Sequence, residues 1–357
     1  MLQWDAKGLR PFASSTNVGI PKVSYIDATL PEAQLHQNLS TQFPDSYVQF
    51  INFSDDGNKL LFSVSSDRDP GSYYLLDRQT NKAQLLFSSM EQLNPEQMAP
   101  RQAISFKSRD GMIIRGYITM HPSKDHKKLP LILMPHGGPH GIADHWFYDN
   151  DAQFLASRGY AVLQVNYRGS GGRGINFKTA GYRHWGDLIQ NDLIDGVKWT
   201  IAQGYADPKR VCSYGASFGA YAALMVTIRE PSMFKCAVGY AGVYDLPLIF
   251  KEENVVRNKK AYNTVVDFLG TDEEELKRNS PSYLAEKIST PVLLVHGEED
   301  TIAPLVQAKS MREALVKANK PYEWMLVPNE GHGFYATKNL RSFYQTLEKF
   351  LKTNLPQ

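Results

Sequence analysis

Residues 211–225 read VCSYGASFGAYAALM, and the architecture of the chain follows from them. An apolar run that predicts a strand leads into Gly-x-Ser-x-Gly at 215–219, and a helical pattern follows at once. The two glycines permit a turn so sharp that the side chain of Ser217 projects at the edge of a sheet. In this context we interpret Ser217 as a nucleophile. The alternative is an ordinary serine in a tight turn.

Apolar runs and helical patterns alternate on both sides of this segment. Continuous apolar runs are typical of strands buried on both faces, and they occur at 131–134, 161–165, 211–214, 236–238, 292–295 and 324–327. Helical periodicity occurs at 187–202, 218–229, 304–318 and 340–351. Residues 104–106 and 113–119 predict an antiparallel hairpin at the sheet edge. We therefore expect an α/β domain over residues 101–357, an α/β-hydrolase fold with a mostly parallel sheet and helices on both faces.

Residues 1–100 have a different pattern, with short strands and turns that predict a small all-β segment. The strands expected are 48–53, 59–64, 73–76 and 83–87, the repeat size of one propeller blade. Residues 1–46 are less regular, with one further strand at 23–26. One blade cannot bury both of its faces, so we expect it to pack on the second domain or on another subunit. Its exposed strand edges also suggest a homo-oligomer.

A serine hydroxyl needs a base to take its proton, and in this fold the partners follow in the order Ser, Asp or Glu, His. After Ser217 the histidines are His296, at the end of a strand, and His332, in a glycine-flanked loop after the last strand. A loop of that kind can reach over the sheet edge. We therefore predict that His332 is the base and that His296 has a structural role.

Three adjacent carboxylates compete to orient that base: Glu298, Glu299 and Asp300. The orienting group accepts a hydrogen bond from the histidine and stabilises the imidazolium. Asp300 lies deepest in the loop, and we choose it; the glutamates are expected to be solvated turn residues. The alternative for Asp300 is a helix N-cap.

Acyl transfer also needs two donors for the developing oxyanion. We predict the backbone N–H of Phe218 and that of Gly138, in the loop PHGGPHG at 135–141. The alternative for this loop is only a tight turn after a strand. Apart from Asp144, the histidines at 136, 140 and 145 lack the carboxylate or thiol neighbours of a metal site, so we expect no metal and no cofactor.

Composition excludes several classes of protein. The 357 residues carry 39 Lys plus Arg against 37 Asp plus Glu, a net charge of +2 that favours neither nucleic acid nor a membrane surface as partner. No apolar run is long enough to span a membrane, and the N-terminus lacks a secretion signal, so we expect a cytoplasmic protein. Cys212 and Cys236 fall in predicted core strands, and we expect two buried thiols.

Five motifs together resemble the prolyl oligopeptidase family, and most closely its acylaminoacyl-peptidase-like branch. They are HGGP at 136–139, NYRGSGG at 166–172, the 215–219 turn, HGxxD at 296–300 and GHGF at 331–334. The resemblance covers about residues 101–355. It implies a serine peptidase domain that acts on small peptides, with Ser217, Asp300 and His332 as its triad.

The chain departs from that family in two respects. Phe218 stands where a tyrosine is usual, and residues 47–90 look like only the last blade of the family's N-terminal propeller. In that family the propeller gates the active site. We therefore expect either a fragment of a longer protein or an enzyme that lacks this gate. The predicted function is hydrolysis of short or N-acylated peptides; the alternatives are a carboxylesterase for small acyl esters and an inactive binding module.

Two further regions are candidates for substrate contact. Arg168 and Arg173 lie in the glycine-rich loop, and the alternative is that this loop only turns. Residues 246–282 are rich in charge and read as an inserted helical segment that helps to build the specificity pocket. We expect its charges to form a solvated face.

Overall fold

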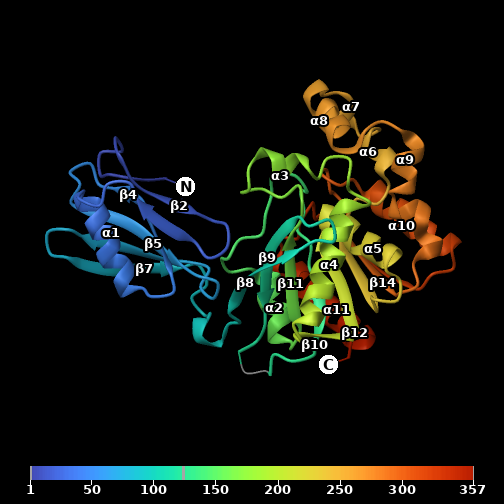
Figure 1. Cartoon of the computed structure of the whole chain (residues 1–357), viewed down its shortest axis with the longest axis horizontal. Helices are drawn as coiled ribbons and strands as arrows, with labels where there is room; N and C mark the ends of the chain where they lie inside the picture. The colour runs from blue at the N-terminus through green and yellow to red at the C-terminus, as the bar shows by residue number, and fades with distance from the viewer. Residues whose placement is uncertain (1, 123–124, 357) are drawn as a thin grey trace. The chain divides into compact units, whose positions relative to one another are not determined.

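The computed structural model of the protein describes residues 2–122 and 125–356 (Figure 1). The described residues of 1–103, 119–123 and 145–158 form one compact unit. Those of 104–118, 124–144 and 159–357 form a second unit. Each unit has its own sheet and core.

The second unit is built on a large sheet that confirms the predicted, mostly parallel architecture. Within the described residues the strand order is β15-β14-β13-β12-β10-β11-β9-β8. The strands are β8 (Arg101–Lys107), β9 (Ile113–Thr119), β10 (Leu129–Leu133), β11 (Ala161–Asn166), β12 (Ala206–Ala216), β13 (Cys236–Tyr240), β14 (Val292–Gly297) and β15 (Tyr322–Val327). β10 pairs in parallel with β11 and β12, and the pairs β12–β13, β13–β14 and β14–β15 are also parallel. The hairpin predicted at the edge is β8–β9, closed where Ser108 N–H donates to the Met112 carbonyl at 2.8 Å.

Helices cover this sheet on both faces. Consecutive residues of a strand point to opposite faces, and β10, β11, β13 and β14 are buried along nearly their whole length, as is β12 from Val211 to Gly215. α4 contacts β11 and β12, α5 contacts β12 and β13, α10 contacts β14, and α11 contacts β13. The helices of the unit are α3 (Ile175–Thr179), α4 (Leu188–Ala202), α5 (Phe218–Arg229), α6 (Leu246–Ile249), α7 (Glu253–Val256), α8 (Lys259–Leu269), α9 (Glu273–Arg278), α10 (Leu305–Lys317) and α11 (Thr337–Asn354).

The predicted blade is present in the first unit. β4 (Tyr47–Phe53), β5 (Lys59–Ser65), β6 (Ser72–Asp77) and β7 (Lys82–Ser88) pair antiparallel in chain order. β4 and β7 are the edge strands of this sheet, and Leu85, Leu86 and Phe87 of β7 are each about half exposed. Association through this edge stays a prediction. Size-exclusion chromatography with light scattering that finds a monomer at every concentration would contradict it.

The first 46 residues are more ordered than the sequence suggested. β1 (Leu2–Trp4), β2 (Pro11–Thr16) and β3 (Lys22–Tyr25) form an antiparallel sheet, and α1 (Pro31–Gln42) follows; α2 (Asn150–Ser157) also belongs to this unit. Leu39 of α1 packs into the blade core with Leu60 and Phe62. The blade therefore buries one face on a helix of its own unit. The expectation that the segment also packs on a second domain or on another subunit stays a prediction.

α1 was missed because its buried face is partly polar. The buried positions include Glu32 and His36, which an apolar pattern does not count. Glu32 pairs with Arg78 at 3.2 Å, and His36 Nδ1 and Nε2 lie 2.7 Å from Tyr25 Oη and 2.9 Å from the Val48 carbonyl. Such partners offset the cost of burying polar groups. They come from distant parts of the chain and are invisible in a local pattern.

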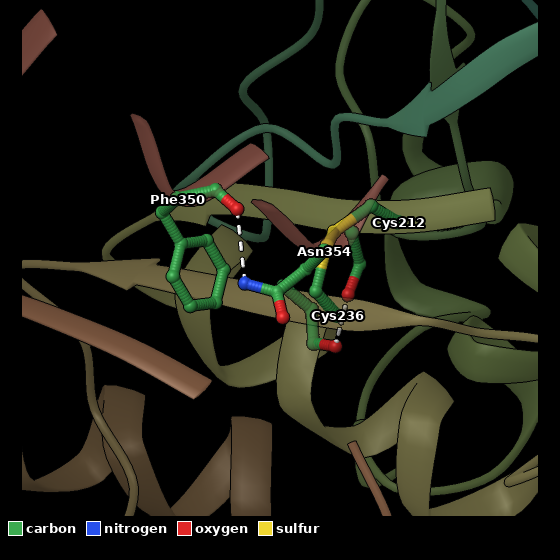
Figure 2. The surroundings of a disulfide bond; sticks show 6 residues. Cys212, Cys236, Phe350 and Asn354 are labelled. Carbon is green, nitrogen blue, oxygen red and sulfur yellow. Dashed lines mark hydrogen bonds between the residues drawn. A yellow bond between two sulfur atoms is a disulfide. The ribbon is translucent and has the colours of Figure 1, made fainter. Parts of the chain in front are cut away.

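The prediction of two buried thiols is wrong. Cys212 and Cys236 are buried, but they are joined by a disulfide bond, which Figure 2 shows beside Phe350 and Asn354 of α11. The parallel register of β12 and β13 places the two residues directly opposite each other, with Cα atoms 4.9 Å apart. That separation lies within the range a disulfide requires. Register is a property of the folded sheet, so the sequence did not reveal the pair.

Across residues 2–122 and 125–356, every helix is too short or too polar to cross a lipid bilayer.

Candidate active site

Ser217 lies between β12, which ends at Ala216, and α5, which begins at Phe218. Its φ of 58° and ψ of −124° are unusual for a residue with a side chain, and strained conformations of this kind concentrate at functional sites. Its N–H donates to the carbonyl of Tyr240 on β13 at 2.9 Å. The local structure is therefore the strand–turn–helix expected around a nucleophilic serine.

The glycines of this turn are required by close backbone approach. A Cβ on Gly215 would lie 2.3 Å from the Gly219 carbonyl oxygen, and one on Gly219 would lie 2.2 Å from that of Pro135. A Cβ on Gly137 would lie 3.4 Å from the Cβ of Ser217. The loop after β10 thus rests directly against the turn that carries Ser217.

His332 and Asp300 form a hydrogen-bonded pair. His332 Nδ1 lies 2.8 Å from Asp300 Oδ2, and Asp300 is buried whereas His332 is partly exposed. A carboxylate only accepts, so Nδ1 carries the proton and the lone pair of a neutral ring stands on Nε2. This is the tautomer that a general base for serine requires.

Asp300 is held from several sides. Its Oδ1 accepts from the N–H groups of Ile302 at 2.9 Å and Ala303 at 2.8 Å. Burial acts to raise the pKa of Asp300, but the hydrogen bonds from His332 and these amides outweigh it and lower the pKa below its ordinary value. Behind it lies His296, buried, with Nε2 3.5 Å from Asp300 Oδ2 and 2.8 Å from the Ala303 carbonyl. Burial lowers the pKa of His296, and the residue packs as a support.

The three predicted triad residues follow neighbouring strands at one sheet edge. Ser217 follows β12, Asp300 follows β14 and His332 follows β15, and β13 lies between β12 and β14. The ring of Phe334, two residues after His332, packs on Tyr240 at 4.9 Å, and the Tyr240 carbonyl accepts from Ser217. These contacts bring the loop of His332 toward Ser217. The hydrogen bond between Ser217 Oγ and His332 Nε2 stays a prediction.

The predicted oxyanion donors lie beside the nucleophile. Phe218 is the first residue of α5, where backbone N–H groups and the helix dipole favour negative charge. The Gly137–Gly138 peptide is oriented by its neighbour, because His136 Nδ1 lies 2.7 Å from the Gly137 carbonyl oxygen and Nε2 lies 2.8 Å from Ser170 Oγ. Donation by the N–H groups of Phe218 and Gly138 stays a prediction.

Arg168 has partners within the protein, and its contact with substrate stays a prediction. Its side chain is buried and meets Asp192 through Nε at 2.8 Å and Nη2 at 2.7 Å, and Asp110 through Nη1 at 2.7 Å. These carboxylates pin the loop after β11 in place, so the guanidinium is engaged within the protein. Arg173 donates to the Ile113 carbonyl at 2.6 Å and stacks on Phe177, which favours the same anchoring role.

Most of the charged segment from α6 to α9 is exposed, as predicted, but Glu252 is an exception. It is half-buried and accepts from Gln307 Nε2 at 3.4 Å. Burial, and to a lesser extent the nearby charge of Asp300, raises the pKa of Glu252 to about 7. A cavity of about 500 Å³ opens here, lined by Glu252, Glu253, Arg257, Asn258, Thr301 and Pro304. Glu298 and Glu299 are exposed, as expected of turn residues.

Sequence reasoning gave no role to Glu330, which is buried close to His332. Its carboxylate accepts from the N–H groups of Tyr335 and Ala336 and from Asn339 Nδ2. A glutamate in a glycine-flanked loop carries no local signal of burial. Among the residues that the structure describes, no group of three or more His, Cys, Asp or Glu side chains is placed to hold a metal ion.

Known proteins share both the sequence and the fold of this chain. The sequence profile of the prolyl oligopeptidase family matches residues 146–357. Dipeptidyl aminopeptidase BIII of Pseudoxanthomonas mexicana is 30% identical over 312 residues, which cover 83% of this chain and 44% of that protein. The chain thus spans about half the length of the relatives it matches.

Solved structures agree on the fold. A puromycin-hydrolyzing peptidase of Mycobacterium tuberculosis superposes with a TM-score of 0.80 at 21% identity, over 99% of this chain and 53% of that one. The acylaminoacyl peptidase of Pyrococcus horikoshii superposes with a TM-score of 0.74 at 20% identity, over 88% of this chain and 50% of that one. Both likenesses extend well beyond the region that the profile matches.

Proposed function

Because the chain belongs to the prolyl oligopeptidase family, we propose that it is a serine hydrolase that cleaves short or N-acylated peptides through an acyl-enzyme. The observation that carries the proposal is the 2.8 Å hydrogen bond between His332 and Asp300, at the sheet edge where Ser217 occupies its strained turn. The names of the similar proteins, a dipeptidyl aminopeptidase and an acylaminoacyl peptidase, favour peptides over simple esters as substrates.

The proposed reaction is a double displacement. Ser217 Oγ attacks the scissile carbonyl carbon while its proton passes to His332 Nε2, and the oxyanion is stabilised by the N–H groups of Phe218 and Gly138. The bond to the leaving amine breaks as His332 returns the proton to it. Water then attacks the acyl-enzyme and gives its proton to His332. The bond between the acyl carbon and Ser217 Oγ breaks as His332 returns this proton to Oγ, and the acid is released. Asp300 stabilises the imidazolium of His332 each time it forms.

A fluorophosphonate probe tests the nucleophile. We expect wild-type protein to be labelled on Ser217, Ser217→Ala to take no label, and the same change to lower kcat by about 10⁶-fold. The matched control is Ser342→Ala, which removes an exposed serine hydroxyl from α11 and should keep full labelling and turnover. Absence of label on the wild-type chain would identify an inactive binding module.

Parallel substrates test the class of acyl group. We expect measurable kcat/KM on anilides of short peptides, with a free or an acylated N-terminus, and dependence on Ser217 in every case. Hydrolysis of p-nitrophenyl esters with no turnover of any peptide anilide would assign the chain to the carboxylesterase alternative.

A further inference from the structure

Glu330 is a buried carboxylate in the loop that carries His332, and the mechanism above does not use it. The residue as a whole is 4% exposed. Oε2 accepts from the N–H of Tyr335 at 2.9 Å, and Oε1 accepts from the N–H of Ala336 at 3.0 Å and from Asn339 Nδ2 at 2.7 Å. A buried charge is costly unless it is satisfied by hydrogen bonds, and these donors satisfy it.

The backbone of the same residue is tied to the loop that carries Asp300. The Glu330 carbonyl accepts from the N–H of Glu299, the residue before Asp300, at 2.9 Å. At the end of β14, a Cβ on Gly297 would lie 2.4 Å from the Glu330 carbonyl oxygen and 2.3 Å from that of Gly331. The acid loop and the base loop are therefore in direct backbone contact at Glu330.

His332 lies between these two attachments. On its N-terminal side the Glu330 backbone is fixed to the acid loop, and on its C-terminal side residues 335 and 336 are fixed to the Glu330 carboxylate. Gly331 and Gly333 flank the histidine, and glycine has the greatest backbone freedom of any residue. α11 begins at Thr337 without a side-chain cap from Ala336, so the carboxylate of Glu330 also satisfies an amide at its start.

We propose that Glu330 is a positioning residue that holds His332 at hydrogen-bonding distance from Asp300 and in line with Ser217. The inference rests on the proposed function, since it concerns the geometry of that triad. Glu330 does not touch the reacting atoms in this scheme. Hydrogen bonds to its own side chain close the loop of residues 330–336 into a ring. This ring limits the movement of the His332 imidazole.

The test is Glu330→Gln, which keeps the size of the side chain but turns one acceptor into a donor that faces N–H groups. We expect kcat on the best peptide anilide to fall about 10- to 100-fold with KM within about twofold, because small misplacements of a catalytic group cost rate in this range. Asn339→Ala removes one donor and leaves the backbone amides bound, so it should lose only about threefold. The matched control, Glu348→Ala, removes an acid that pairs with Lys352 on the same helix and should leave kcat unchanged.

A double-mutant cycle separates positioning from simple loss of folded protein. In an Asp300→Asn background the histidine has already lost its anchor, so we expect Glu330→Gln to lower kcat by less than about threefold there. An equal loss in both backgrounds, or a loss matched by the unfolded fraction seen in circular dichroism, overturns the inference. If Glu330→Gln does not fold, Asn339→Ala in the same cycle gives the deciding result.

The failure of this inference is distinct from that of the proposed function. A wild-type chain that takes no fluorophosphonate label overturns both. A labelled, active wild-type chain with full kcat in Glu330→Gln and Asn339→Ala overturns the positioning role alone.

Discussion

At the scale of single residues, Asp300 divides its two oxygens between two tasks. Oδ1 is held by the amides of Ile302 and Ala303, and Oδ2 faces the Nδ1–H of His332. An amide at this position would still accept from the backbone through its oxygen. Its NH2 group would then face the imidazole N–H, and the ring would turn to the tautomer with its proton on Nε2.

We therefore predict that Asp300→Asn lowers kcat by about 10⁴-fold while the protein stays folded, because the wrong tautomer of His332 cannot accept a proton from Ser217. Steady-state kinetics on the substrate found for the wild type measure this. Glu298→Gln, a neutralised carboxylate in the same turn, is the control and should retain its activity. A loss of less than about tenfold in Asp300→Asn would assign the orienting role to another group.

Residue roles could be predicted where a motif carries them. Ser217, Asp300 and His332 follow from the order of the motifs and from loop position, and the structure brings His332 and Asp300 together. Arg168 and Glu330 could not be read in this way. Whether a charged side chain is buried depends on partners such as Asp192 and Asn339, and only the folded chain shows these.

At the scale of elements, the segment from α6 to α9 contains one carboxyl group, that of Glu252, whose surroundings differ from those of its neighbours. Burial raises the pKa of Glu252 to about 7 from an ordinary 4.5. The folded protein then holds this proton to higher pH than the unfolded chain does. Between about pH 4.5 and 7 the unfolded state loses its proton first, so the free energy of unfolding falls as the pH rises through this window.

We predict that Glu252→Gln stabilises the protein more at pH 8 than at pH 5. The full shift corresponds to about 3 kcal/mol, and because the side chain is partly solvated we expect the difference to be about 1 kcal/mol. Denaturant unfolding at the two pH values measures it. Glu253→Gln, which neutralises an exposed carboxylate paired with Arg257, should show no comparable pH dependence. An equal effect of Glu252→Gln at both pH values would contradict the prediction.

Elements with continuous apolar runs were the ones that sequence located well. β10, β11, β13 and β14 are buried on both faces, as is β12 from Val211 to Gly215, so nearly every residue of these runs is selected for burial and the pattern is unambiguous. α1 is the counter-example. Its buried face includes Glu32 and His36, and a polar face satisfied by distant partners does not produce the helical periodicity of apolar residues.

At the scale of the whole molecule, a covalent bond joins two central strands of the large sheet. Cys212 and Cys236 close a loop with a sequence separation of 24. Such a link reduces the entropy of the unfolded chain, and for this loop length the contribution is about 3 kcal/mol. No local sequence pattern indicates this disulfide, because it depends on the pairing of β12 with β13.

We predict that Cys212→Ala/Cys236→Ala lowers the free energy of unfolding by about 3 kcal/mol or less, and that reductant has this effect on the wild type but none on the double variant. Chemical denaturation with and without reductant measures both. Ser289→Ala, an exposed serine replaced outside this pair, is a neutral control. Alkylation of both cysteines in unreduced, denatured wild-type protein would show that the disulfide does not form.

The rate at which the disulfide is reduced also reports local opening of the sheet next to the turn that carries Ser217. Both cysteines are shielded from solvent, and Ser217 lies five residues beyond Cys212, directly after the end of the same strand. A small thiol can attack the disulfide only after β12 and β13 separate locally. With the thiol in excess, the rate of disulfide reduction therefore reports how often that opening occurs. In cells that keep their thiols reduced, reductants reach the disulfide through the same local opening. Whether a preparation carries this disulfide, next to the turn of Ser217, therefore depends on the redox conditions to which it has been exposed.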